Sequence, residues 1–363
     1  MGCTHPQIRL ETNKRYKNTQ GKWSYKSVLY WSEKGESISR IIKDARNLLI
    51  SGNYRKYDII PCGKCLGCFL ERSRDKAVQL SLEKLNPEYK ENECWFITLT
   101  YEDEYLPVHS TVDTETGEVF SGVSLELKDI QNWIKKLRDN NPDKKIRYMC
   151  AREYGTQTYR PHYHIIVFGL PLDRELFCQI GNNANGDPLW TTPQLDNIQS
   201  NICWTVRRPL GDRKAPIYRA GNVIVGEVTF QSIAYVARYT MKKANKDYNS
   251  EFWYKAQGMD IEAISQSQDL GKWYYDLHKH EIYKSDLVPI LGKNDNFSRP
   301  PRSFDRFYKK EYPKEFQKVI ERRKEKMLTS LMQKEKQTDM DFVQMLESQE
   351  LKINQFKDMR GAI

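Results

Sequence analysis

The stretch Arg160-Pro161-His162-Tyr163-His164-Ile165-Ile166-Val167-Phe168 decides how this chain folds. It ends in an apolar run, which is typical of a buried strand, and it begins with two histidines separated by one residue. Side chains along a strand alternate between its two faces, so His162 and His164 project to one side and Tyr163 to the other. Two imidazoles side by side can share a divalent ion, although such a pair standing alone is more often structural.

The residues before this stretch predict its partner strand in a hairpin. Arg147 to Glu153 has the composition of a strand, and a turn is expected between Gly155 and Thr158. Glu153 can therefore face the two histidines from the neighbouring strand. Two imidazoles and a carboxylate suit Mg²⁺ or Mn²⁺ that keeps open positions for a substrate, and the same set would also take zinc.

A second constellation lies on the segment from Ser232 to Lys243, which has a clear helical period. One stripe of it is apolar, and Tyr235, Tyr239 and Lys242 cluster on nearly the opposite side. Tyrosines four residues apart commonly form an ordinary aromatic pair. A phenol with a pKa of about 10, however, needs a nearby positive charge or metal to act as a nucleophile at neutral pH, and Lys242 lies one turn from Tyr239. We therefore expect the two tyrosines to attack a phosphodiester with the assistance of Lys242.

Together these motifs resemble the HUH endonuclease superfamily, in the arrangement where a His-hydrophobe-His motif precedes the tyrosine helix. Phe96 to Tyr101 resembles the upstream strand motif of that superfamily. The chain is more closely similar to the replication initiator proteins of microviruses, small single-stranded DNA phages, and particularly of the gokushovirus group. Four stretches within roughly the first 245 residues carry this likeness: Pro61 to Cys68, Thr98 to Tyr101, Glu153 to His164, and Tyr235 to Tyr239. The chain departs from the family pattern at residues 290–310.

The resemblance implies a fold and a set of roles. The fold would be α+β, with a central antiparallel sheet of about five strands and flanking helices. His162 and His164 would bind the catalytic Mg²⁺ or Mn²⁺, together with Glu153 from the hairpin. Tyr235 and Tyr239 would be paired nucleophiles that alternate in cleavage and rejoining of DNA.

These roles define a replication initiator. It would nick the single-stranded origin of a small circular phage genome, hold the 5′ end as a phosphotyrosine, and rejoin strands during rolling-circle replication. The resemblance also implies a host helicase and DNA polymerase as partners, and the cytoplasm of a bacterial host as the place of action. Two alternatives stay open: a zinc-stabilised nucleic-acid-binding protein without cleavage activity, and an HUH transposase or relaxase.

Three thiols lie close together in Cys62-x-x-Cys65-x-x-Cys68, which follows a proline and contains two glycines. Turn-rich sequences of this kind let thiolates converge on one ion. A closed Zn²⁺ site needs a fourth ligand. The resemblance favours Cys3, because relatives also begin with a near-terminal cysteine, and His5 is a second option. A structural zinc is expected, with an iron-sulfur cluster or free thiols as alternatives. The remaining cysteines are expected to be small core residues without disulfides: Cys94, Cys150, Cys178 and Cys203.

The composition favours a nucleic-acid partner. The formal net charge is +10, and 22 tyrosines and 8 tryptophans offer flat surfaces on which bases stack. Basic and aromatic residues are interleaved in Lys14 to Lys26 and in Arg299 to Lys310, which suits a phosphate backbone, although an ordinary solvated face is the alternative. No apolar run approaches the ~20 residues of a membrane span, so a soluble protein without a membrane partner is expected.

We expect four segments along the 363 residues. They are an N-terminal arm with the cysteine knuckle at 1–68, an endonuclease domain at 69–248 with a polar insertion at about 170–219, an accessory region at 249–310, and a charged helical C-terminal tail at 311–363.

Overall fold

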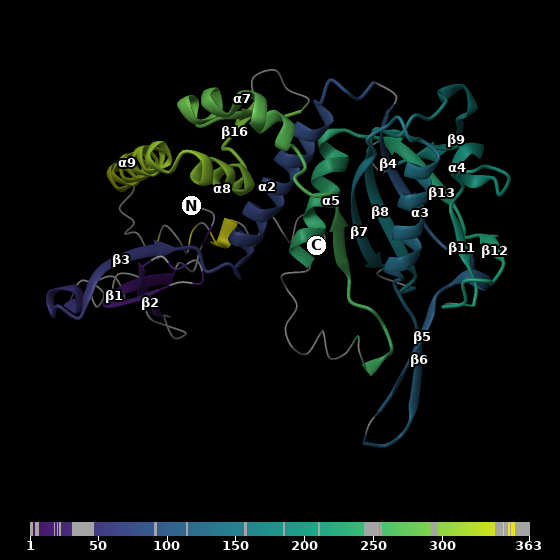
Figure 1. The fold of residues 1–363 in the computed structure, drawn as a ribbon, viewed down its shortest axis with the longest axis horizontal. Coiled ribbons are helices and arrows are strands. Elements are labelled where there is room, and N and C mark those ends of the chain that lie inside the picture. Colours follow the sequence, from purple (N-terminus) through teal and green to yellow (C-terminus); the bar gives the residue numbers. More distant parts are fainter. Residues whose placement is uncertain are drawn as a thin grey trace. The chain divides into compact units, whose positions relative to one another are not determined.

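The structure of the chain is a computed structural model, drawn as a ribbon in Figure 1. The described residues are Cys3, 7–17, Thr19, Gly21, 23–30, 47–90, 93–113, 115–155, 158–183, 186–209, 211–242, Tyr254, 256–291, 296–337, Gln344, Ser348 and 350–352. Two compact units make up the chain: Met1–Arg72 with Gln317–Ile363, and Ser73–Phe316. The finer division into four segments stays a prediction.

A seven-stranded sheet organises the larger unit, in the order β14-β7-β8-β4-β13-β10-β9. Every neighbouring pair in it is antiparallel. The strands are β4 (Cys94–Leu99), β7 (Arg147–Tyr154), β8 (Pro161–Phe168), β9 (Cys178–Asn182), β10 (Pro188–Thr191), β13 (Val223–Glu227) and β14 (Ala263–Gln266). The expected α+β fold with a central antiparallel sheet and flanking helices is thereby confirmed.

The sheet is larger than the expected five strands. Strands β9 and β10 come from the segment expected as a polar insertion, and β14 comes from the segment expected as an accessory region. Each has four or five residues, with side chains that are exposed or half-buried throughout. These strands therefore lack the alternation of apolar and polar residues that marks a half-buried strand in a sequence.

The hairpin of β7 and β8 carries the motif from which the fold was predicted. Its turn is closed by the backbone N–H of Gly155, which donates to the carbonyl of Arg160 at 2.9 Å. The register pairs Glu153 with His162, and β4 on the other side of β8 pairs Thr98 with His164. Three consecutive strands thus bring their polar side chains to one region of the sheet.

Helices cover both faces of this sheet (Figure 1). Helix α3 (Leu127–Asp139) packs Ile130 and Trp133 against the face that carries Tyr163. Helix α5 (Phe230–Lys242) packs Ile233 and Val236 against the opposite face. Because the apolar stripe of α5 lies on the sheet at the level of its central strands, the helix also delivers its tyrosines there.

The other elements of the larger unit are short or peripheral. They are β5 (Val108–Val112), β6 (Val119–Val123), α4 (Pro193–Asp196), β11 (Thr205–Arg207), β12 (Ile217–Arg219), α7 (Lys272–Ser285), β15 (Val288–Pro289), β16 (Phe297–Ser298), α8 (Arg302–Glu311) and two short 3-10 turns (Asp103–Tyr105 and Arg174–Leu176). Strands β5 and β6 form a hairpin that extends beyond the sheet in Figure 1.

The smaller unit contains a three-stranded antiparallel sheet in which β1 (Gln7–Lys17) lies between β2 (Trp23–Tyr30) and β3 (Tyr54–Ile60). Two helices, α2 (Leu66–Lys84) and α9 (Pro313–Gln337), contain residues of both units. Within the described part of the chain, no helix combines the length and the apolar character that crossing a bilayer requires.

Candidate active site

The two histidines of β8 lie on the face of the sheet that α5 covers. His164 is only 9% exposed, and Ile166 and Phe168, which follow it at alternate positions, belong to the apolar cluster that includes α5. Tyr163 and Ile165 point into the cluster on the other face. The alternation expected for this strand therefore places both imidazoles on the side of the tyrosine helix.

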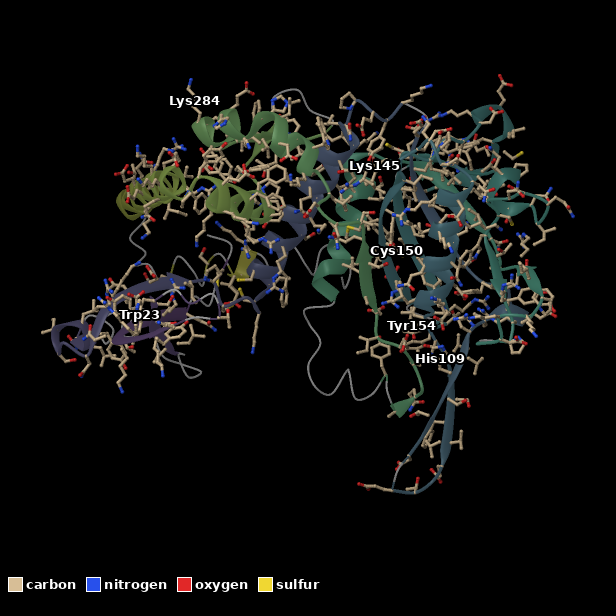
Figure 2. All side chains as sticks on the ribbon, in the orientation of Figure 1. Trp23, His109, Lys145, Cys150, Tyr154 and Lys284 are labelled. Atoms are coloured by element: carbon tan, nitrogen blue, oxygen red, sulfur yellow. The ribbon has the colours of Figure 1, made fainter. Side chains whose placement is uncertain are left out.

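Glu153 joins the histidines from β7, next to Tyr154, which Figure 2 labels. It is paired directly with His162 in the register, and its Oε1 lies 2.9 Å from Nε2 of His164. The carboxylate is nearly buried, so it is held against the imidazole in a region of low dielectric. Glu153 and His164 are thus in contact at one end of the hairpin, and the register places His162 opposite Glu153.

The ring orientations of the histidines suit metal ligation. His162 places Nδ1 2.6 Å from the carbonyl oxygen of Arg160, which only accepts, so Nδ1 is the donor of this hydrogen bond. His164 places Nδ1 3.0 Å from the hydroxyl of Thr98. A ligating histidine normally has its second nitrogen fixed in this way. The sequence predicts these imidazoles and the Glu153 carboxylate as ligands of a divalent ion, and that role stays a prediction.

Gly155 leaves the space that the His162 ring occupies. A Cβ atom at position 155 would lie 3.1 Å from Cε1 of that ring, closer than most such contacts. Any other residue here would press on the imidazole. Neither Thr98 nor Gly155 was singled out as a site residue, although both lie within stretches that carried the family resemblance.

Both tyrosines of α5 pack on His164. The ring of Tyr239 is stacked on it at 5.7 Å and 15°, and the ring of Tyr235 meets it edge-on at 5.2 Å. The two tyrosine rings are 5.2 Å apart at 85°. The hydroxyl of Tyr239 donates to Oε1 of Glu153 at 2.7 Å, the same oxygen that contacts His164. Tyr235 is more accessible, with 38% of its surface exposed.

The environment of Tyr239 favours the neutral phenol. Burial and the neighbouring Glu153 carboxylate raise the pKa of Tyr239 far above its ordinary value. In this arrangement Tyr239 is a hydrogen-bond donor. Glu153 is the acceptor of that hydrogen bond.

Lys242 is the cation that the sequence predicts beside the two tyrosines. Lys242 is the last residue of α5, but its side chain lies outside the described residues. Arg238 is a described cation beside the pair, with its guanidinium carbon 5.8 Å from the centre of the Tyr235 ring. The role of Lys242 stays a prediction.

A buried network of polar groups supports the histidine strand from behind, and the sequence did not predict it. The hydroxyls of Tyr163 and Tyr101 are 2.9 Å apart, and Tyr101 donates to Oδ2 of Asp129 at 2.9 Å. Arg208 pairs with the same carboxylate oxygen at 2.8 Å. The backbone N–H of Glu126 donates to Tyr163 at 2.8 Å, which ties α3 to β8.

The cysteine knuckle lies in the smaller unit, where Cys3 meets the three cysteines of the motif. The four sulfur atoms lie within 4.8 Å of one another. The Sγ of Cys3 is 3.6 Å from that of Cys62 and 3.8 Å from that of Cys65, and Cys62 is 3.9 Å from Cys68. A tetrahedral ion with bonds of about 2.3 Å separates its sulfurs by about 3.8 Å. The cluster can therefore bind a metal such as zinc, with Cys3 as the fourth ligand; the alternative ligand His5 lies outside the described residues.

The backbone donors and the electrostatics of the knuckle also favour metal binding. The N–H groups of Cys62 and Gly63 donate at 3.3 Å to the sulfurs of Cys3 and Cys68, respectively. Contact with Cys65 and burial raise the pKa of the Cys3 thiol far above its ordinary value, and burial raises that of Cys68 to about 11. Four crowded thiols cannot all ionise without a cation, and a bound metal deprotonates them.

The four other cysteines are free, as expected, but one of them is not a core residue. Cys94, Cys150 and Cys203 are buried. Cys178 is exposed, because it lies on the edge strand β9, where every side chain faces solvent. The expectation of burial was wrong there.

The chain is similar to a known protein family and to individual phage proteins. The family model for replication-associated protein ORF2/G2P matches residues 94–244, which include the histidine hairpin and α5. The chain is 31% identical to the replication-associated protein ORF2 of Spiroplasma virus 4 over 310 residues, 83% of this chain and 84% of that protein.

Two further relatives are more distant. The replication-associated protein VP4 of Bdellovibrio phage phiMH2K is 25% identical over 267 residues, 70% of this chain and 69% of that protein. The replication-associated protein ORF4 of Chlamydia phage 1 is 27% identical over 244 residues, 66% of this chain and 52% of that protein. No solved structure matches the chain.

Proposed function

The chain belongs to the family of replication-associated protein ORF2/G2P, and from this premise we propose that it is a phage replication initiator that cuts single-stranded DNA by tyrosine attack. It nicks the origin of its own circular genome, retains the 5′ end as a phosphotyrosine, and rejoins strands in rolling-circle replication. The host helicase and DNA polymerase are its expected partners, in the cytoplasm of a bacterial host.

One observation carries this proposal. Oε1 of Glu153 lies 2.7 Å from the hydroxyl of Tyr239 and 2.9 Å from Nε2 of His164. A nucleophile, a proton acceptor and a ligand of a metal are thus joined through a single carboxylate oxygen. A pure binding face has no need of this convergence, because bases and phosphates are bound by exposed rings and cations.

The residues suggest how the first cut proceeds. The Tyr239 oxygen bonds to phosphorus while Glu153 takes the phenolic proton, and the bond from phosphorus to the 3′ oxygen breaks. The leaving 3′ oxygen takes a proton from water and becomes a free 3′ hydroxyl. Tyr235 lies one helical turn away and can repeat the reaction on a second strand while the first 5′ end stays attached. Arg238 and, from the sequence, Lys242 offer positive charge for the phosphate.

His162, His164 and Glu153 are the residues that we expect to hold a divalent ion. When bound, Mg²⁺ or Mn²⁺ supplies Lewis-acid polarisation of the phosphodiester. The protein's own contribution is to orient the donors: the Arg160 carbonyl fixes His162, and Thr98 fixes His164. In the structure Nε2 of His164 lies 2.9 Å from Oε1 of Glu153, and an ion would take the place of the proton between these two atoms.

A structural zinc in the knuckle is the second part of the proposal. The sulfur separations match those of a tetrahedral thiolate site, and backbone N–H groups donate to the sulfurs as they do around bound metals. An iron-sulfur cluster shares the ligand type but would absorb visible light, whereas zinc leaves the protein colourless.

The experiment that tests the proposal detects the covalent intermediate. Purified protein is incubated with labelled single-stranded oligonucleotides tiled across its genome, with Mn²⁺ added or withheld, and adducts that survive denaturation are sought. We expect an adduct that needs the ion and His162, and that disappears only in the double variant Tyr235→Phe/Tyr239→Phe. Tyr274→Phe on α7 serves as the matched control. Tight binding without an adduct on any oligonucleotide would instead support the non-cleaving DNA-binding protein, and an adduct restricted to mobile-element ends would support a transposase or relaxase.

A further inference from the structure

The small N-terminal sheet carries a face of cations and aromatic rings that the cleavage reaction does not use. We call it the Trp23 face, and it is formed by Arg15, Lys17, Trp23, Tyr25 and Arg55. The register pairs Arg15 with Tyr25 and Lys17 with Trp23, so these four side chains project to the same side of β1 and β2. Figure 2 labels Trp23 on this sheet.

The rings and cations of the Trp23 face are ordered against one another. The guanidinium carbons of Arg15 and Arg55 lie 5.0 and 3.9 Å from the centre of the Tyr25 ring, and the ammonium nitrogen of Lys17 lies 5.5 Å from that of Trp23. Nε of Arg15 also donates to the hydroxyl of Tyr25 at 2.9 Å. These contacts hold the charged groups beside the rings and leave the indole itself open, with 66% of Trp23 exposed.

The opposite face of the same sheet forms the core of this unit. Ile8 and Leu10 are buried there and pack against Leu48, Tyr54 and Tyr57. Packing therefore explains the apolar residues on that side. It does not explain a tryptophan on the solvated side, where a polar residue would fill the same position without exposing an indole.

The charge on the Trp23 face is not balanced locally. Glu11 pairs with Arg55 at 3.2 Å, and Asp58 pairs with Arg9 at 2.8 Å, so both carboxylates already have a cationic partner. Within the described part of the chain, Arg15 and Lys17 form no ion pair; Arg15 contacts Tyr25, and Lys17 contacts Trp23. Two cations on the same face as an exposed indole can therefore bind an anionic partner.

We propose that the Trp23 face binds single-stranded DNA at a place separate from the site of cleavage. One base stacks on the Trp23 indole, and the phosphates that flank it lie at Arg15 and Lys17. Every base has a flat face, so such stacking tolerates any sequence, and neighbouring cations neutralise the backbone. A duplex fits poorly because its bases are already stacked inside. This inference rests on the proposed function and adds a second binding site for the same substrate.

The test measures binding without cleavage. A fluorescently labelled oligonucleotide of twenty thymidines is titrated with the full-length protein, and anisotropy gives Kd at several salt concentrations. The variants are Trp23→Ala, Trp23→Phe and the double variant Arg15→Gln/Lys17→Gln. Lys135→Gln, an exposed lysine on α3 across the sheet from the tyrosines, is the matched charge control.

We expect Trp23→Ala to raise Kd roughly tenfold, within the range for one base–aromatic stack, while Trp23→Phe keeps most of the affinity. The double cation variant should lower the slope of log Kd against log salt by about 1.4, because each phosphate contact contributes about 0.7 on single strands. Lys135→Gln should leave both quantities unchanged, and a duplex of the same length should be insensitive to Trp23→Ala.

Two results would overturn the inference. One is a Trp23→Ala protein that keeps its circular dichroism spectrum and binds the oligonucleotide as the unmodified protein does. The other is an equal loss for single strand and duplex, which would reduce the face to general electrostatic attraction. Neither result depends on cleavage. Failure of the covalent-adduct assay would therefore contradict the proposed function, and the binding measurement would still be interpretable.

Discussion

Thr98 holds His164 through a hydrogen bond of 3.0 Å to Nδ1. Thr98→Val keeps the shape of the side chain and removes this partner, so the imidazole can rotate and its tautomer is no longer fixed. Second partners of ligating histidines are typically worth 10–100-fold, and we expect adduct formation to slow by about that factor at limiting Mn²⁺. Thr100→Val is the control, since its hydroxyl is 3.4 Å from its acceptor, the carbonyl of Asn222. Equal rates for both variants would exclude an orienting role for Thr98.

At this scale the sequence revealed what depends on local periodicity. The alternation of a strand placed His162 and His164 on one face, and the helical period placed Tyr235 and Tyr239 on one side of α5. The contact of Thr98 with His164 depends on a register between strands that are 66 residues apart in sequence. Periodicity within a segment carries no information about such pairings.

Strand β8 and helix α3 are joined by the buried group of Asp129, Arg208 and Tyr101. Asp129→Ala leaves the Arg208 guanidinium, whose side chain is 13% exposed, without its carboxylate. We expect the free energy of unfolding to fall by about 3–5 kcal/mol in urea denaturation. Adding Arg208→Met should restore a large part of the loss, because the unpaired charge is gone. A double variant no more stable than Asp129→Ala would mean that Arg208 acts through other contacts.

Helix α2 carries a lysine whose charge is costly in the folded state. Burial lowers the pKa of Lys76 to about 8, although its ammonium donates to Gln79 at 2.7 Å. Below pH 8 the lysine is charged in both states and the full penalty applies, while between pH 8 and about 10.5 the unfolded state binds more protons and stability rises. Lys76→Met should therefore raise the free energy of unfolding by up to about 3 kcal/mol at pH 7 and by much less at pH 10. A gain independent of pH would show that packing, not charge, is responsible.

Elements with strong patterns were predicted closely, and weakly patterned ones were missed. Helix α5 was expected from Ser232 to Lys243 and spans Phe230–Lys242. Strands β9 and β10 were not expected, because their side chains are exposed or half-buried and pairing with neighbouring strands, not local preference, makes them strands.

The cysteine knuckle brings Cys3 next to the cysteines at the start of α2. We expect one zinc per chain, and its removal by a chelator should lower the melting temperature. Cys65→Ser should lose the metal, and Cys178→Ser, at the exposed cysteine of β9, should keep it. The measurement is metal content by mass spectrometry together with thermal unfolding. Full zinc content in Cys65→Ser would contradict the assignment.

On the scale of the whole molecule, the family resemblance predicted the α+β class, and the antiparallel sheet with its flanking helices confirms it. The division into two compact units could not be predicted from the sequence, because α2 and α9 continue across the boundaries between the units. A helix that continues without a break gives no signal of a boundary in composition or turn residues.

The most direct test of the central claim identifies the residue that carries the DNA. The covalent adduct is digested with nuclease and protease, and the peptide bearing the residual nucleotide is sequenced by mass spectrometry. The account predicts a peptide from α5 with the nucleotide on Tyr239 or Tyr235, the two tyrosines packed on His164. A nucleotide attached to any residue outside α5 would contradict it.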